Sequence, residues 1–192
     1  MTKSIILASS SPRRKRLLEQ IGLSFEIVPS NVEEVINLQL SLREQAESLA
    51  LQKAQAVAAK VEEGIVLGAD TLVALGNEII GKPKDSQDAK RILKKLRGRQ
   101  HIVVTGFVLI DKENNRTIIK SVETKVWFRK FSSEEIEAYV ARENLMDKSG
   151  AYAITGLAAI FIEKIEGDFY NVVGLPLFTL AKELKKLGID VL

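Results

Sequence analysis

The segment SIILASSSPRRKRLLEQIG, from Ser4 to Gly22, passes from a short apolar run directly into a helix. The run at 4–8 is typical of a buried strand, and serines end it. Ser11 is a favourable N-cap, Pro12 suits the first helical position, and Gly22 suits the position just after the last turn. A strand that leads straight into a helix favours an α/β protein.

The rest of the chain alternates in the same way. Strands are expected within 24–30, 64–75, 101–110 and 117–128, and a strand with a glycine turn within 159–169. Helices are expected within 41–64, 86–98, 132–144 and 176–188. The helix that begins after Ser41 carries a capping box with Glu44. A hairpin formed by 64–75 and 76–83 makes the sheet mixed rather than all parallel. The predicted fold is therefore α/β, with a mixed, twisted central sheet flanked by helices.

Composition excludes several classes of protein and site. A net charge of +3 and a pI near 9.0 are too mild to indicate nucleic-acid binding by themselves, although they favour an anionic ligand. The absence of cysteine excludes disulfides and zinc–thiolate sites, and a single histidine excludes histidine-rich metal sites. The N-terminal apolar run is too short for a signal peptide, and no segment has the length of a membrane span. We therefore expect a cytoplasmic protein with no membrane partner.

The helix that follows the serines begins with four cations, at 13–16. A helix N-terminus is already partly positive, so each nearby cation costs about 0.3–1 kcal/mol unless an anion is present. Backbone N–H groups and serine hydroxyls at such a turn commonly hold phosphate, and Arg13 or Arg14 could add a bidentate contact. The alternative is a basic helix end whose side chains reach into water.

Lys53 interrupts an otherwise apolar helix face. Leu42, Ala46, Leu49 and Val57 share its stripe at spacings of three and four residues. Either Lys53 faces a cleft and meets an anion, or its stem lies along the edge of the core while its ammonium group reaches solvent. The pattern alone leaves both interpretations open.

The motif VLGADT brings Asp70 and Thr71 to the expected end of a strand, where α/β proteins place ligand-binding groups. An aspartate at such a position also serves as a turn or cap residue. Together with Glu33 or Glu34, however, Asp70 offers the oxygen ligands that suit Mg²⁺ or Mn²⁺ bound to phosphates. Lys82, in the GKP loop, is either a further phosphate contact or a turn lysine.

Six ordered blocks of the chain resemble the Maf family of nucleoside triphosphate pyrophosphatases, long named septum formation inhibitor proteins. The blocks are ILASSSPRRKRLL, VEE, LALQKA, VLGADT, GKP and DKSGAYAITG with GDFYNVVGLPL. The resemblance runs from about Ile5 into the last helix. It implies one domain over 1–192, two lobes with a substrate cleft between them, and hydrolysis of a nucleoside triphosphate to the monophosphate and pyrophosphate with a divalent cation, Mg²⁺ or Mn²⁺.

The resemblance also implies roles for individual residues. Asp70 would be the proton acceptor that activates water, and Glu33 would hold the metal together with Asp70. Substrate binding would fall to Ser9, Ser11, Arg13, Arg14, Lys53 and Lys82, and specificity to Arg13, Thr71 and Thr155.

One block departs from the family pattern. The branch that acts on dTTP and UTP typically has GAYGIQG, whereas this chain has GAYAITG, with Thr155 at the position of the glutamine. The GAY context resembles that branch rather than the one that acts on 7-methyl-GTP. Threonine is shorter than glutamine and lacks the paired donor and acceptor of an amide, so the preferred base stays open.

Two other functions fit parts of the sequence. The basic run at 90–99 suits a nucleic-acid or division-machinery binding module, but that interpretation gives Asp70, Glu33 and Lys53 no shared purpose, and we expect no stable nucleic-acid partner. An inosine-triphosphate-type pyrophosphatase would use similar chemistry on purines. The resemblance makes a homodimer plausible, and His101 is expected to be structural or solvated.

Overall fold

A computed structural model describes residues 3–37 and 39–192, and the chain forms two compact units. The first unit comprises Met1–Asp70, Thr105–Val122 and Gly174–Leu192, and the second comprises Thr71–Val104 and Glu123–Val173. No helix in the described part of the chain is long and apolar enough to cross a membrane.

The strands form a mixed sheet in the order β2-β1-β3-β5-β6-β7, with β4 paired to β3. β1 is parallel to both β2 and β3, whereas β4 is antiparallel to β3 and β7 is antiparallel to β6. The predicted α/β class with a mixed sheet is thus confirmed. The strands are β1 Ile5–Leu7, β2 Phe25–Ile27, β3 Ile65–Leu75, β4 Glu78–Ile80, β5 Gln100–Asp111, β6 Arg116–Phe128 and β7 Ile162–Glu166.

The helices agree with the sequence pattern except near the end of the chain. The predicted strand with a glycine turn, at 159–169, is confirmed over Ile162–Glu166, but its first residues form part of a 3₁₀ helix, Leu157–Phe161, and an unpredicted helix begins at Phe169. Asp168 Oδ1 starts that helix by accepting hydrogen bonds from the backbone N–H groups of Tyr170 (2.7 Å) and Asn171 (3.2 Å). The α-helices are α1 Pro12–Gln20, α2 Leu42–Ala58, α3 Ser86–Leu96, α4 Ser133–Val140, α5 Phe169–Val173 and α6 Leu177–Lys185.

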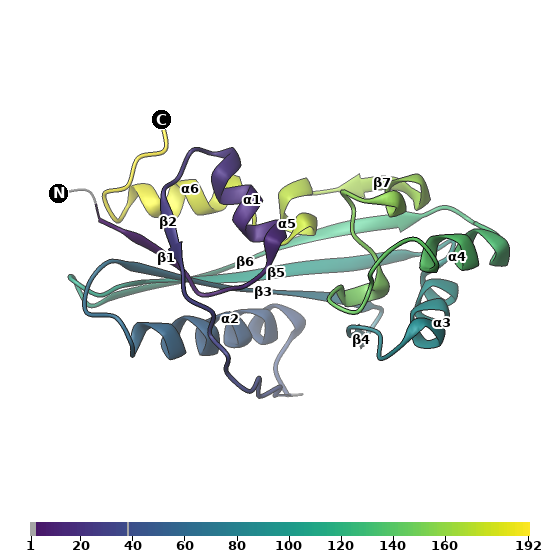
Figure 1. Cartoon of the computed structure of the whole chain (residues 1–192), viewed down its shortest axis with the longest axis horizontal. Coiled ribbons are helices and arrows are strands. Elements are labelled where there is room, and N and C mark those ends of the chain that lie inside the picture. The colour runs from purple at the N-terminus through teal and green to yellow at the C-terminus, as the bar shows by residue number, and fades with distance from the viewer. Residues whose placement is uncertain (1–2, 38) are drawn as a thin grey trace. The chain divides into compact units, whose positions relative to one another are not determined.

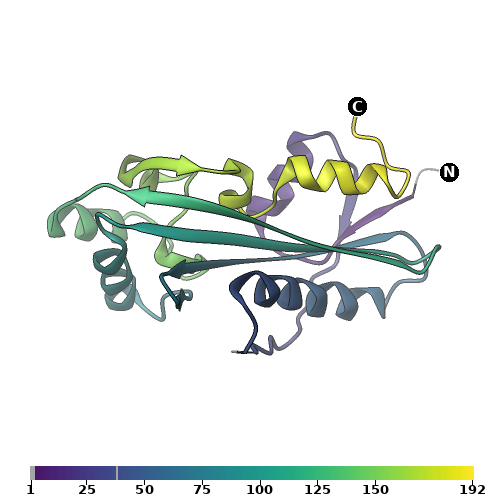
Figure 2. The same cartoon turned by 180° about the vertical axis from the view of Figure 1, so that it is seen from behind.

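In the first unit, helices cover both faces of the sheet. α2 lies on one face, and α1 and α6 lie on the other (Figures 1 and 2). α2 begins with the predicted capping box, in which both hydrogen bonds between Ser41 and Glu44 are present. Its buried alanines lie directly against two strands: a Cβ added to Gly68 of β3 would lie 2.4 Å from a backbone atom of α2, and so would one added to Gly106 of β5. These glycines let the helix backbone approach the sheet closely, which fixes the height of α2 side chains above β3.

The second unit has a core rich in aromatic rings. α3 packs against α4 and against a 3₁₀ turn, Ser149–Ala151 (Figure 1). Phe128 makes edge contacts with Tyr152 (ring centroids 4.9 Å apart) and with His101 (4.8 Å). His101 is 1% exposed, and its Nε2 lies 2.8 Å from the Tyr152 hydroxyl. Of the two roles expected for His101, the structural one is therefore correct.

Burial of His101 makes the stability of the protein depend on pH. Burial lowers the pKa of His101 from 6.5 to about 4. Between these two pH values the unfolded chain binds a proton that the folded chain does not, so stability is full above pH 6.5 and falls as the pH drops toward 4. We expect the free energy of unfolding to lose about 3 kcal/mol over this range through His101.

The measurement is urea unfolding of the wild type and of His101→Gln at several pH values between 4 and 7. Gln cannot titrate, so the variant lacks this contribution while both proteins share the effects of all carboxylates. Parallel pH profiles for the two proteins would contradict the prediction.

Candidate active site

The sheet topology brings three separate segments to one edge of the first unit. β2, β1 and β3 are parallel neighbours, so the chain leaves β1 and β2 at the same edge. The segment 9–14 follows β1, and the segment 33–34 follows β2. Asp70 lies three residues beyond Leu67, whose register partner on β1 is Leu7. Residues far apart in the sequence are thus collected at this edge.

The sequence predicts Asp70 at the end of a strand, but in the structure Asp70 lies within β3. β3 continues to Leu75, because Val73–Leu75 pairs with the antiparallel strand β4. The parallel neighbour β1 is only three residues long and stops at Leu7. Asp70 is therefore held in regular strand backbone just past the end of its neighbour, which gives it a fixed direction.

Lys53 joins two carboxylates at this edge. Its Nζ bonds to Oδ1 of Asp70 and lies 2.9 Å from Oε1 of Glu34. The side chains of Lys53 and Asp70 are each 13% exposed, so water screens this pair only in part. Of the two interpretations of Lys53, the one that required an anion holds, and the anions are carboxylates of the chain itself.

Glu34, rather than Glu33, reaches Lys53 because the acidic loop is tied to α2. The side-chain amide of Gln52 accepts a hydrogen bond from the Val35 N–H (2.9 Å) and donates one to the Val35 carbonyl (2.9 Å). Gln52 directly precedes Lys53 on the helix, so this double contact sets Glu34 beside the lysine. Glu33 is exposed. The role of Gln52 was not predicted from the sequence, in which its place next to Lys53 was the only signal for it.

The loop after β1 is organised around the Ser9 hydroxyl. Ser9 Oγ accepts hydrogen bonds from the Ser11 backbone N–H (3.2 Å) and from Arg14 Nη1 (3.2 Å). Arg14 also donates from Nε to the Gly174 carbonyl (3.0 Å). Ser11 occupies the predicted N-cap position, but its side chain makes no capping hydrogen bond.

Arg14 and Arg13 differ in environment although they are neighbours. Arg14 is 9% exposed and Arg13 is half-buried. Burial lowers the pKa of Arg14, whereas the negative charges of Asp70 and Glu34 raise it in part. A guanidinium group stays protonated in proteins, so Arg14 is a permanent buried cation within the field of the two carboxylates.

A second group of predicted residues lies in the second unit. The 3₁₀ turn Ser149–Ala151 contacts two of the motifs: Ser149 Oγ donates to the Thr71 carbonyl (3.3 Å), and the Gly150 N–H donates to the Gly81 carbonyl (3.1 Å). Gly150 has φ +75°, a conformation that favours glycine. The turn therefore holds the GKP loop beside Thr71.

Lys82 and Thr155 are both exposed in this unit. Thr155 lies in a turn that is closed by a hydrogen bond from the Gly156 N–H to the Ala153 carbonyl (3.0 Å). The turn presents the threonine side chain to solvent, so it is accessible to a ligand.

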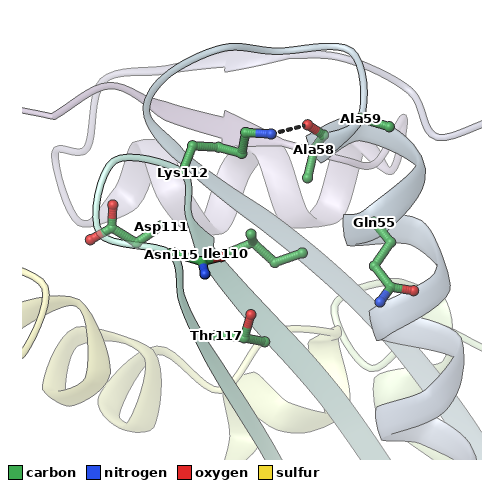
Figure 3. A pocket seen from close by; sticks show the side chains of 8 residues that line it. All are labelled: Gln55, Ala58, Ala59, Ile110, Asp111, Lys112, Asn115 and Thr117. Atoms are coloured by element: carbon green, nitrogen blue, oxygen red, sulfur yellow. Dashed lines mark hydrogen bonds between the residues drawn. The ribbon is translucent and has the colours of Figure 1, made fainter.

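The first unit also has a pocket of about 320 Å³ at the C-terminal end of α2 (Figure 3). Lys112 Nζ donates there to the Ala58 carbonyl (2.8 Å), one of the carbonyls that end the helix. None of the predicted site residues lines it. The pocket is lined by Gln55, Ala58, Ala59, Ile110, Asp111, Lys112, Asn115 and Thr117.

The carboxylates at the first unit's edge suit a hard divalent cation. Among the described residues, no group of three or more His, Asp or Glu side chains could by itself hold a metal ion. Mg²⁺ commonly uses only one or two protein carboxylates and takes its other ligands from water and substrate phosphates. Asp70 with Glu34 or Glu33 therefore fits the carboxylate part of such a cation site.

Comparison of the sequence with known proteins identifies the family of the chain. The family model described as Maf-like protein matches residues 4–187. A dTTP/UTP pyrophosphatase of Dictyoglomus turgidum is 50% identical over the full length of both chains, and one of Ruminiclostridium cellulolyticum is 49% identical over 97% of each. Among solved structures, the Staphylococcus aureus Ham1 protein is 14% identical, with a TM-score of 0.45 over 66% of this chain and 72% of its own. Because the family model spans nearly the whole chain and full-length relatives share about half of its residues, the chain belongs to the Maf-like protein family.

Proposed function

We propose that the chain is a nucleoside triphosphate pyrophosphatase of the dTTP/UTP type, with residues 1–192 acting as one domain. The arrangement of Lys53 between Asp70 and Glu34, beside the buried cation Arg14, carries the proposal. It combines a fixed carboxylate with cations at the edge where parallel strands end. The names of relatives about 50% identical to this chain support the substrate class.

In the proposed reaction, water attacks the α-phosphorus and the bond to the bridging oxygen of the β-phosphate breaks. Asp70 accepts the proton of the attacking water, and pyrophosphate leaves with the bridging oxygen. Lys53 bonds to Oδ1 of Asp70, so we assign proton acceptance to Oδ2 and contact with the cation to the remaining lone pair of Oδ1. A carboxylate held in strand backbone has the fixed direction that general-base catalysis needs.

The triphosphate carries several negative charges, and the reaction moves charge onto the leaving pyrophosphate. Cations and N–H donors placed in advance stabilise that charge without reorganising. We assign this role to Lys53, Lys82, Arg13 and the donors of the loop at Ser9 and Ser11. The basic start of α1 is then explained, because a bound triphosphate offsets the unfavourable charge at that helix end.

A divalent cation, Mg²⁺ or Mn²⁺, is proposed as the cofactor. Asp70 and either Glu33 or Glu34 would hold it together with substrate phosphates. When bound, such an ion polarises phosphoryl oxygens and neutralises charge on the leaving group. Glu34 already lies beside Asp70 through Lys53, which makes it as good a candidate as Glu33.

We assign base and substrate choice to Arg13, Thr71 and Thr155. Thr155 is accessible, but its hydroxyl offers one donor and two lone pairs where glutamine offers a longer amide. A bridging water can fill the remaining distance to a pyrimidine edge at little cost.

A nucleotide panel tests the proposed function. Purified protein with Mg²⁺ or Mn²⁺ is given dTTP, UTP, CTP, GTP, 7-methyl-GTP and ITP, and the release of monophosphate and pyrophosphate is measured. We expect turnover of dTTP and UTP. Thr155→Gln should lower KM for these two by about three- to tenfold, because a longer amide replaces a water-bridged contact.

The other outcomes of the panel separate the alternatives. Preference for ITP would favour a purine pyrophosphatase and overturn the pocket assignment. No pyrophosphate release from any nucleotide would contradict the enzyme assignment and favour a binding module. Thr179→Gln, a half-buried threonine on α6, is the matched control for the substitution at Thr155.

A further inference from the structure

The Ser9 hydroxyl is held in an unusual state of hydrogen bonding. A serine hydroxyl has one hydrogen to donate and two lone pairs that accept. The Ser11 N–H and Arg14 Nη1 both donate to Ser9 Oγ, each over 3.2 Å. Neither donor can reverse its role, because a backbone N–H and a guanidinium group only donate. Both lone pairs of Ser9 Oγ are therefore occupied, and its hydrogen is what it can offer a ligand.

The contacts of Arg14 fix its hydrogen bond to Ser9 Oγ. It is 9% exposed, and its Nε donates to the Gly174 carbonyl (3.0 Å) while Nη1 donates to Ser9. Gly174 lies 160 residues away in the sequence, just before α6. The rigid fork of the guanidinium group spans these two acceptors, which a single ammonium nitrogen cannot do in the same geometry. Arg14 is thus anchored on one side and directs Ser9 on the other.

We infer that Arg14 is a positioning residue that makes Ser9 an obligatory hydrogen-bond donor to a phosphate oxygen of the substrate, and not a ligand of the divalent cation. This inference rests on the proposed function and deepens it. A hydroxyl binds a metal ion through a lone pair, and both lone pairs of Ser9 are in use. Arg13, which is less buried than Arg14, is left as the arginine that meets the substrate directly.

The first test measures binding of inorganic tripolyphosphate by calorimetry, with EDTA and separately with Mg²⁺. We expect Ser9→Ala to weaken binding by about 10- to 100-fold under both conditions, as the loss of a hydrogen bond to a charged acceptor does. Ser133→Ala, at the exposed first residue of α4, is the matched control and should bind like the wild type. Weakening that occurs only with Mg²⁺ would mean that Ser9 ligates the cation and would overturn the inference.

The second test is a double-mutant cycle of Ser9→Ala and Arg14→Met, measured at high salt so that long-range charge effects are screened. If Arg14 acts through Ser9, the double variant should bind tripolyphosphate within about twofold of the weaker single variant. Independent effects that multiply would show that Arg14 binds phosphate by itself and would overturn the inference. Arg142→Met, at an exposed arginine just beyond the end of α4, is the matched control.

A third variant distinguishes a purely structural role of Arg14 from its proposed role in positioning Ser9. Arg14→Lys keeps the charge but cannot bond to both Ser9 and Gly174 in the present geometry, so we expect it to restore thermal stability more fully than tripolyphosphate affinity. Arg14→Lys also allows the inference to be tested if Arg14→Met does not fold. Full recovery of affinity by lysine would contradict the role of the fork.

These binding tests are independent of the nucleotide assay. Failure of the wild type to hydrolyse any nucleotide would contradict the proposed function, while the cycle would still show whether Arg14 acts through Ser9. Normal hydrolysis combined with additive effects would overturn only the inference about Arg14.

Discussion

Asp70→Asn is expected to lower kcat on the preferred nucleotide by about 10²- to 10⁴-fold, the usual contribution of a general base. The amide cannot accept the proton of the attacking water. Its size and its Oδ1 acceptor are retained, so the Lys53 ammonium group keeps a hydrogen bond to a neutral oxygen in place of the ion pair. KM should change much less than kcat. Steady-state kinetics on the nucleotide chosen by the panel gives both values.

The fold should survive this substitution, which circular dichroism and a thermal melt can check. Asp190→Asn is the matched control, because Asp190 is exposed near the C-terminus and pairs with Lys185 (3.1 Å). It should keep wild-type kcat. A kcat for Asp70→Asn within threefold of the wild type would remove Asp70 from the reaction.

The second large effect is expected for Lys53→Met. Methionine keeps the apolar stem of the side chain but removes the cation that joins Asp70 and Glu34. The two carboxylates then repel an incoming triphosphate that Lys53 would have bound. We expect kcat/KM to fall by about 10²- to 10³-fold, as on removal of one preorganised donor. A rise in KM should account for a substantial part of that loss.

Two further variants make this result specific. Lys60→Met removes an exposed lysine just beyond the end of α2 and should have wild-type kinetics. Lys53→Arg keeps the charge in a different shape and should give intermediate activity. An unchanged kcat/KM for Lys53→Met would show that its ion pairs are structural only.

Local sequence patterns predicted those elements whose signals lie within a few residues. The capping box at Ser41 and Glu44 starts α2, and a hairpin sequence pairs β3 with β4. Such signals depend on neighbours in the chain, so they can be interpreted without the fold. The region 159–169 has equally strong strand composition, but the strand ends before Gly167, which has a positive φ. Asp168 then caps the start of α5.

The sequence predicted the types of side chain at the site but not which of them contact one another. The residue pattern left Glu33 and Glu34 equal, and the family resemblance named Glu33 for the metal. The double contact of Gln52 with Val35 places Glu34 beside Lys53. That contact joins residues 17 positions apart, on a loop and on a helix, and no periodicity reports it. The roles of the site residues stay predictions until the variants are measured.

By itself, the sequence determined the α/β class, the start of α2 and which residue types could bind phosphate, because these follow from local periodicity, capping and side-chain chemistry; the triphosphate itself was implied only by the family resemblance. Only the tertiary structure decided which of the two adjacent arginines is buried and what it holds. Arg13 and Arg14 are chemically identical, and they differ because the Gly174 carbonyl, 160 residues from Arg14, accepts a hydrogen bond from it. A contact of that span exists only once the parallel strands and α6 are packed together.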